Sequence, residues 1–249
     1  LSGVRVLDLD RGTLTPISGG GIFPHHAWSP DGTQLVYSSL RESTPKMYKA
    51  NANGGVSVEL LASSPLEKFP SHWTESGLVF EEGPTGTRHD LKLLPPDSGT
   101  PRTLVANGHH AYGAQVSPDG GLIAFVSDET GTDQVYLQRF PESVGERVPV
   151  STTGGTMPVW RDDGLELFYS SEVGWLMAVS VRVEGANVEL GRPRALFDLG
   201  TTIWYRGARV WWPCAGGQEF LVLRNAMSSA SQNIRLTLNW TELIEQRDK

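Results

Sequence analysis

The stretch Trp28-Ser29-Pro30-Asp31-Gly32-Thr33-Gln34-Leu35-Val36-Tyr37 recurs along the 249-residue chain. Close copies are V-S-P-D-G at 116–120, followed by L-I-A-F at 122–125, and W-R-D-D-G at 160–164, followed by L-E-L-F-Y at 165–169. Weaker copies begin at Trp73, as W-T-E-S-G-L-V-F, and at Trp211, as W-W-P-C-A-G-G. The anchor positions 28, 73, 116, 160 and 211 are spaced by 45, 43, 44 and 51 residues. A period in this range, with several short strands in each unit, is typical of β-propeller blades.

The turn inside each close copy has a physical basis. In S-P-D-G, Pro presets φ at about −65°, Asp accepts a hydrogen bond from the backbone ahead, and Gly takes the position with positive φ. Apolar strand residues follow directly, as the inner hairpin of a blade requires. A single turn of this kind is common, but five copies in phase predict a repeated fold.

Each unit is predicted to hold four strands, from runs of alternating or continuous apolar residues. The first, inner strands are predicted at 22–28, 69–73, 111–116, 157–160 and 208–212. The second strands are predicted at 34–39, 78–82, 122–127, 165–170 and 219–223. The third strands are predicted at 47–50, 90–94, 134–140, 175–183 and 234–240, and the fourth at 56–61, 102–105, 147–151 and 194–199.

The fifth unit lacks a fourth strand before its tail at 241–249. We expect the N-terminal segment 13–18 to supply it, because propellers remove open sheet edges by closing the ring with a terminal strand. The fold class is therefore an all-β propeller of five four-stranded antiparallel blades in one domain, residues 1–249. Segment 4–10 looks like another third strand, either a spare outer strand or the remnant of a sixth blade, and six blades are the alternative.

Composition narrows the class of protein. With 28 Gly and 16 Pro scattered along it, the chain is predicted to be rich in turns rather than disordered. A net charge of −7 argues against a nucleic-acid partner, since no basic stripe is present to displace counterions. The single Cys214 excludes an internal disulfide, and no apolar run is long enough to span a membrane. The chain starts at Leu1 without a leader, which predicts a processed or trimmed piece and leaves the compartment open.

The repeats resemble the WD-like propeller repeats of the TolB family, whose blades carry W-S-P-D-G-x-x-L-A-F. The resemblance runs from about Trp28 to Trp240; copies one, three and four are close, while copies two and five depart. The ending N-I-R-L-T-L-N-W at 233–240 is similar to the last strand of propellers that follow bacterial serine/threonine kinase domains. The resemblance implies a sensing or protein-interaction role and favours a periplasmic or extracytoplasmic location.

Other families are excluded on motifs. The chain has neither H-R-D nor D-F-G, so it holds no kinase domain. Sialidase Asp boxes separate Asp and Gly by one residue, whereas these residues are adjacent here. Eukaryotic WD repeats end their third strand in Trp-Asp, and no Trp-Asp pair is present. The absence of a G-x-S-x-G elbow excludes a prolyl-oligopeptidase-type hydrolase.

All six histidines are predicted to lie on one face of the disc. Five fall near the predicted starts of inner strands, namely His25, His26, His72, His109 and His110. His89 belongs to a loop between a second and a third strand, and such loops are predicted to open on the same face. Three interpretations remain open for this funnel.

The first interpretation is a divalent metal site, with His25, His72 and His110 as candidate ligands. Oligogalacturonate lyases share a similar repeat and use propeller histidines with a metal, so a lyase is its enzymatic form. The second is a protonation-sensitive funnel for an acidic group, to which Arg206 and Arg209 add positive charge. The third is that the histidines bond to neighbouring backbone and fill a polar channel.

The aromatic residues fall into two groups. Trp28, Trp73, Trp160 and Trp211 are in phase and are predicted to be wedges between blades in the core. Trp204 and Tyr205 lie beside Arg206 in the longest connection between blades, a composition typical of an interface hot spot, although one of them could instead plug the channel. The acidic residues of the loops are predicted to form a solvated rim: Glu42, Glu81, Glu82, Asp128, Glu129 and Glu172.

The leading functional prediction is a non-catalytic TolB-like binding module that presents one face to a protein, a peptide or a small acidic ligand, with no cofactor. The alternative is a metal-assisted polysaccharide lyase or hydrolase that uses the funnel histidines. A third possibility is a structural fragment of a larger kinase-linked sensor.

Overall fold

The computed structural model describes residues 3–8, 10–19, 21–40, 44–61, 64–106, 108–142, 146–185, 187–200, 210–222 and 236–237. Apart from one short 3-10 turn, η1 (Ala215–Gly217), every regular element in these ranges is a β-strand. No helix in the described part of the chain is long and apolar enough to cross a membrane. The predicted all-β class is confirmed.

Three sheets of the described residues have the four antiparallel strands expected of blades, and a fourth sheet has five. Blade 1 contains β3 (Gly21–Trp28), β4 (Gln34–Leu40), β5 (Lys46–Asn51) and β6 (Val58–Leu60). Blade 2 contains β7 (Glu67–Thr74), β8 (Gly77–Gly83), β9 (Asp90–Leu94) and β10 (Arg102–Val105). Blade 3 contains β11 (Ala111–Val116), β12 (Leu122–Ser127), β13 (Gln134–Arg139) and β14 (Val148–Pro149).

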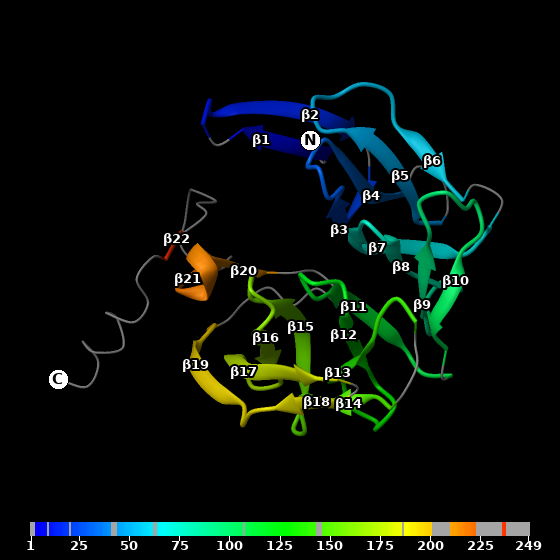
Figure 1. Cartoon of the computed structure of the whole chain (residues 1–249). Coiled ribbons are helices and arrows are strands. Elements are labelled where there is room, and N and C mark those ends of the chain that lie inside the picture. The colour runs from blue at the N-terminus through cyan, green and yellow to red at the C-terminus, as the bar shows by residue number, and fades with distance from the viewer. Residues whose placement is uncertain are drawn as a thin grey trace.

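Blade 4 is larger than the repeat predicts. Its strands are β15 (Gly155–Trp160), β16 (Glu166–Ser171), β17 (Trp175–Glu184) and β19 (Arg194–Asp198). The long β17 also pairs through its second half with β18 (Asn187–Leu190), a strand that the sequence analysis missed. Blade 5 is described as β20 (Trp211–Cys214), β21 (Glu219–Val222) and β22 (Leu236–Thr237). The blades follow one another around a ring with their first strands toward its centre (Figure 1), which confirms a β-propeller.

The closure predicted from the sequence is wrong within the described residues. Strand β2 (Thr13–Gly19) pairs with β1 (Gly3–Asp8) in a separate two-stranded sheet and not with blade 5. A short turn explains this, because the carboxylate of Asp8 accepts hydrogen bonds from the amides of Asp10 (3.1 Å) and Arg11 (3.0 Å). Closing so short a loop costs far less entropy than pairing both ends of the chain. The described residues thus hold five blade sheets and a separate β1–β2 hairpin, the segment from which the six-blade alternative was inferred. The single-domain assignment stays a prediction.

The Asp-Gly turns of the repeats share one hydrogen-bond pattern. In blade 1 the hydroxyl of Ser29 donates to Oδ1 of Asp31 (2.6 Å) and accepts from the amide of Gln34 (2.9 Å). Blade 3 repeats the first bond between Ser117 and Asp119 (2.5 Å). These bonds tie the turn to the first residue of the second strand, so each S-P-D-G copy fixes the register of an inner hairpin.

Blade 4 keeps the turn with a different donor. Arg161 stands where the other copies have Ser, and its Nε donates to Oδ1 of Asp163 (2.8 Å). Gly164 has φ of +72°, close to the +68° of Gly32 and the +71° of Gly120. The repeat therefore conserves the shape of the turn while the side chain that braces it changes.

Replacement of Gly120 by Ala is expected to destabilise the protein, because its φ of +71° is a conformation that L-residues adopt only with strain. We expect a loss of about 1–2 kcal/mol in the free energy of unfolding, measured by chemical denaturation. Gly99→Ala is the matched control, since Gly99 lies in a turn with nothing within 4 Å of an added Cβ and without positive φ. Equal losses in the two variants would contradict this interpretation.

Apolar clusters between successive sheets form the core. Val79 and Leu91 of blade 2 pack with Ile123 and Phe125 of blade 3 in one cluster. Similar clusters join blades 1 and 2, blades 3 and 4, and blades 4 and 5. Face-to-face packing of this kind removes apolar surface from water at about 25 cal/mol per Å². We call these contacts the interblade clusters.

Two anchor tryptophans are the wedges predicted from the sequence. Trp160 is 6% exposed and its Nε1 donates to the carbonyl of Gln115 in blade 3 (3.1 Å). Trp211 is fully buried and its Nε1 donates to the hydroxyl of Ser170 in blade 4 (2.8 Å). Each indole thus joins its own blade to the preceding one, and Trp73, half-buried, packs against the cluster between blades 1 and 2.

Trp28 is not a buried wedge, which corrects the prediction for the first anchor: it is 40% exposed. The sheet that precedes blade 1 in the described residues is the β1–β2 hairpin. Its apolar side chains, including Val4 and Ile17, pack against Tyr37 and Tyr48 on β4 and β5. Trp28 therefore lacks the neighbouring inner strand that covers Trp160 and Trp211.

The two environments give different stability predictions. Trp160→Phe removes a buried indole that also makes an interblade hydrogen bond, so we expect a loss of about 1–3 kcal/mol in the free energy of unfolding. Trp28→Phe changes a side chain that is 40% exposed, and we expect a change within about 0.5 kcal/mol. Thermal or urea denaturation measures both. A larger loss in the Trp28 variant would show that the wedge positions are assigned wrongly.

Candidate functional site

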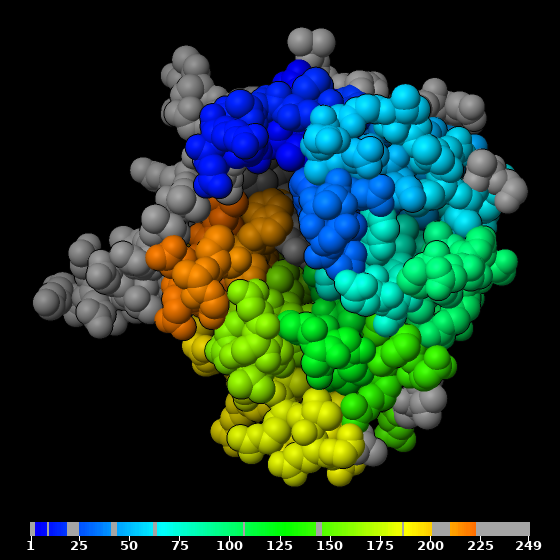
Figure 2. Space-filling view, turned by 45° about the horizontal axis from the view of Figure 1, so that its top comes forward, coloured from blue at the N-terminus to red at the C-terminus, as the bar shows by residue number. Residues whose placement is uncertain are grey.

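The inner strands of all five blades line a cavity of about 520 Å³ at the centre of the ring (Figure 2). Strands β3, β7, β11, β15 and β20 each contribute side chains to its wall, and Glu81 reaches it from β8. This volume lies within the usual range for small-molecule and peptide-side-chain sites. The repeat places the cavity there, because equivalent strands of successive blades face one axis.

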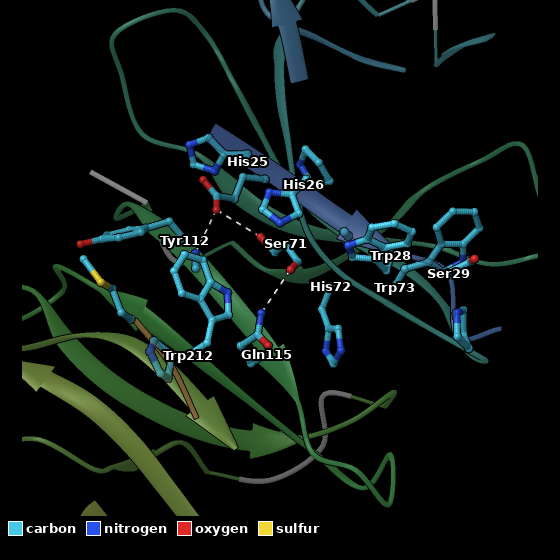
Figure 3. A pocket seen from close by; sticks show the side chains of 17 residues that line it. His25, His26, Trp28, Ser29, Ser71, His72, Trp73, Tyr112, Gln115 and Trp212 are labelled. Atoms are coloured by element: carbon cyan, nitrogen blue, oxygen red, sulfur yellow. Dashed lines mark hydrogen bonds between the residues drawn. The ribbon is translucent and has the colours of Figure 1, made fainter. Parts of the chain in front are cut away.

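Aromatic side chains form much of the wall. Trp28 and Trp73 lie on one side of the view in Figure 3, and Tyr112 and Trp212 lie on the other. Pro30, Pro70, Pro158 and Met157 add apolar surface. Rigid aromatic surface of this kind binds apolar chains, rings and cations with little loss of side-chain entropy.

Glu81 is a buried carboxylate at the wall of this cavity, 3% exposed. Its Oε1 accepts hydrogen bonds from the hydroxyl of Ser71 (3.1 Å) and the amide of Gly113 (2.9 Å). Burial opposes the charged form, but interactions with His89 and His25 and the amide bond outweigh it, so the pKa of Glu81 is lowered. The carboxyl group is therefore ionised at neutral pH.

His89 balances this charge from behind the cavity. Its Nε2 lies 3.3 Å from Oε2 of Glu67, and its Nδ1 lies 4.0 Å from Oε2 of Glu81. Burial works against protonation of the ring, but the carboxylates of Glu81 and Glu67 outweigh it and raise the pKa of His89. The three side chains form a buried cluster of alternating charge.

His110 extends this cluster toward blade 3. Its Nδ1 accepts a hydrogen bond from the amide of His89 (3.0 Å), and its ring stacks on Tyr112 with centroids 4.8 Å apart. Its own amide donates to Oδ1 of Asp128 (2.8 Å). The side chain of His109 is 45% exposed, with Nδ1 3.8 Å from the same oxygen.

His25, His26 and His72 line the cavity itself. Burial lowers the pKa of His25, while the charge of Glu81 acts in the opposite direction. Nδ1 of His72 accepts a hydrogen bond from the amide of Val116 in blade 3 (2.9 Å). His72 therefore serves as a link between blades as well as a lining residue.

Comparison with known proteins finds similar sequences and structures, although no protein-family model matches the chain. An uncharacterized protein of Agrobacterium fabrum is 27% identical over 205 residues, which cover 80% of this chain and 69% of that protein. The Tol-Pal system protein TolB of Xanthomonas campestris is 31% identical over 105 residues. That match covers 40% of this chain and 24% of the TolB sequence.

The crystal structure of TolB from Acinetobacter baumannii aligns with a TM-score of 0.61 at 16% identity, over 79% of this chain and 49% of that chain. The chain is a TolB-like β-propeller. A structure of oligogalacturonate lyase in complex with manganese aligns with a TM-score of 0.60 at 14% identity, over 88% of this chain and 67% of that chain. At such identity the lyase likeness shows the fold alone.

The TolB-like propeller does not gather its histidines at one level. Strand β3 begins at Gly21 and ends at Trp28, so His25 and His26 lie in its second half instead of at its start. His72 likewise lies near the end of β7, whereas His109 and His110 precede β11. Strands β3 and β7 begin at Gly21 and Glu67, before the predicted starts at 22 and 69, so their histidines lie further along the strands than the prediction assumed.

The metal interpretation has no support from ligand geometry in the described residues. No group of three His, Cys, Asp or Glu side chains there is arranged to hold a metal ion. Of the candidate ligands His25, His72 and His110, the last two use Nδ1 to accept backbone hydrogen bonds. Trp204, Tyr205, Arg206 and Arg209, the candidates from the long connection, lie outside the described residues.

Glu81 is the site residue that sequence reasoning misplaced on a solvated rim. Its neighbour Glu82 is also buried, at 9% exposure. The repeat did contain a signal for this position. The anchor Trp73 pairs with Leu78 on the second strand, and Glu81 lies three residues after Leu78. The same count reaches Ser38 and Ser170, which are fully buried. A charge at this position of the second strand predicts an internal site.

Glu81→Gln is expected to lower the pKa of the His89 imidazole, because it removes the carboxylate that favours protonation. The ionised Glu81 stabilises the fold at any pH above its ordinary pKa of 4.5. This stabilisation is lost as pH falls through the lowered pKa that Glu81 has in the folded protein. Protonated His89 contributes its full stabilisation of the fold below its ordinary pKa of 6.5. That stabilisation is lost as pH rises through the raised pKa that His89 has in the folded protein. The stability difference between wild type and variant is therefore largest between 4.5 and 6.5.

Histidine-detected NMR titration measures the imidazole pKa, and urea denaturation across pH measures the stability difference. Glu75→Gln is the control, since Glu75 is exposed on blade 2. An unchanged His89 pKa in the Glu81 variant would contradict the proposed charge cluster.

Proposed function

We propose that this TolB-like propeller is a non-catalytic binding module that takes a segment of a protein or peptide into its central cavity. The observation that carries the proposal is the wall of the cavity, where aromatic residues of four blades face one space: Trp28, Trp73, Tyr112 and Trp212. Aromatic anchors in a recess dominate the affinity of many protein interfaces. Glu81 and His72 beside them accept hydrogen bonds from backbone amides of blade 3, which fixes the position of both side chains at the wall.

The second support is rigidity. Gln115 donates to the carbonyl of Ser71 (3.2 Å) and its own carbonyl accepts from Trp160, so the inner strands of three blades are linked at the cavity wall. A preformed wall loses little entropy when a ligand binds. Resemblance to the TolB family adds a protein-interaction role and an extracytoplasmic, periplasmic location to the proposal; fractionation of cells that express the native gene product tests the location.

Peptides selected on the wild-type protein from a displayed library test the binding role. The double variant Trp28→Ala, Trp212→Ala is expected to bind the selected peptides with an affinity at least about tenfold lower, because it removes two aromatic anchors. Trp175→Ala is the matched control, since Trp175 is 41% exposed, as Trp28 is 40% exposed, and it lies outside the cavity on β17. Isothermal titration calorimetry measures the affinities. Equal weakening by the control, or peptides indifferent to the cavity variant, would contradict the proposal.

The alternative, a metal-assisted polysaccharide lyase, draws support from the manganese-bound oligogalacturonate lyase with the same fold. It predicts that the purified protein, given manganese and oligogalacturonate, forms an unsaturated product detectable by ultraviolet absorbance. The binding-module proposal predicts no such product. Turnover that is lost in His72→Ala but retained in His109→Ala would favour the lyase and overturn the proposal.

A further inference from the structure

The charged groups at the cavity wall point to the chemistry of the ligand. The acidic and histidine side chains that line it in the described residues are those of Glu81, His25, His26 and His72, and neither Lys nor Arg lines it there. Burial lowers the pKa of His25, and Nδ1 of His72 accepts a hydrogen bond from the amide of Val116. The carboxylate of Glu81, ionised at neutral pH, places a negative charge at the wall.

One oxygen of that carboxylate retains acceptor capacity. Both hydrogen bonds to Glu81 end on Oε1, from Ser71 and Gly113. The contact of Oε2 with Nδ1 of His89 is 4.0 Å, longer than a hydrogen bond. An ionised carboxylate accepts up to about four hydrogen bonds, so Glu81 can receive a further donor from the cavity.

The aromatic wall favours the same sign of charge. The faces of Trp and Tyr rings carry a negative potential and attract ammonium and guanidinium groups within about 6 Å. Trp28, Trp73, Tyr112 and Trp212 surround the space that Glu81 lines. Apolar rings also cover the methylene chain that carries such a cation in Lys or Arg.

We propose that the cavity binds a cationic alkyl group of its ligand, the ammonium or guanidinium of a Lys or Arg side chain in a peptide, with the charge at Glu81 and the carbon chain between the aromatic side chains. This inference rests on the proposed function, because it names the feature of the peptide that the cavity recognises. The charge proposed for the ligand is opposite in sign to that of the acidic ligand predicted from the sequence. That prediction counted Arg206 and Arg209, which lie outside the described residues.

Three probes of equal size and different charge test the inference on the intact chain: n-butylammonium, n-butanol and butyrate. Indole N–H resonances of the cavity tryptophans report binding in NMR titrations, and Trp175 serves as the reference outside the cavity. We expect butylammonium to bind at least about tenfold more tightly than butanol, as a charge-assisted hydrogen bond to a buried carboxylate provides. Glu81→Gln should remove at least about tenfold of that affinity, and Glu75→Gln should leave it unchanged.

Equal affinity for butylammonium and butanol, or preference for butyrate, would overturn the inference even if Glu81→Gln failed to fold, because the comparison uses the wild-type protein. Peptides that bind through the cavity without need of Lys or Arg would also overturn it and leave the proposed function standing. If the library yields no peptide that binds but butylammonium binds saturably, the cation site would be upheld and the peptide-binding role refuted.

Discussion

Packing of neighbouring sheets against each other is the constraint on which the rest of this molecule depends. A four-stranded blade cannot bury its apolar face alone, so each one lies against the next through an interblade cluster. Trp160 and Trp211 add hydrogen bonds from one blade to the preceding one. Because each contact turns the next sheet by a similar amount, the first strands of the blades converge on one axis and enclose the cavity.

Near-equivalent blades make a polar site from small departures between copies. The buried position on the second strand holds Ser38 in blade 1, Val126 in blade 3 and Ser170 in blade 4, but Glu81 in blade 2. A charge in that position demands partners, and His89 supplies one on the side away from the cavity. The aromatic wall and the carboxylate of Glu81 thus arise within the same repeated framework, which is the basis of the proposed binding site.

The sequence predicted the ring and most of its strands because turn chemistry and apolar periodicity are local signals. Prediction of closure failed at Thr13–Gly19, since whether a terminal strand pairs locally or across the ring depends on the competing hairpin turn at Asp8. The histidines were expected near strand starts, but β3 begins at Gly21 and β7 at Glu67, so His25, His26 and His72 lie well inside these strands. Glu81 was misplaced because acidic residues are usually exposed.

The most direct measurement of this account is the titration of the side-chain carboxyl carbon of Glu81 by NMR. Interblade packing that buries this group beside His89 and the amide of Gly113 predicts a pKa below the ordinary glutamate value of 4.5, with the carboxylate fully ionised at neutral pH. A pKa at or above 4.5 would contradict the account, because the carboxyl group would then be either solvated on the rim or neutral in the cavity.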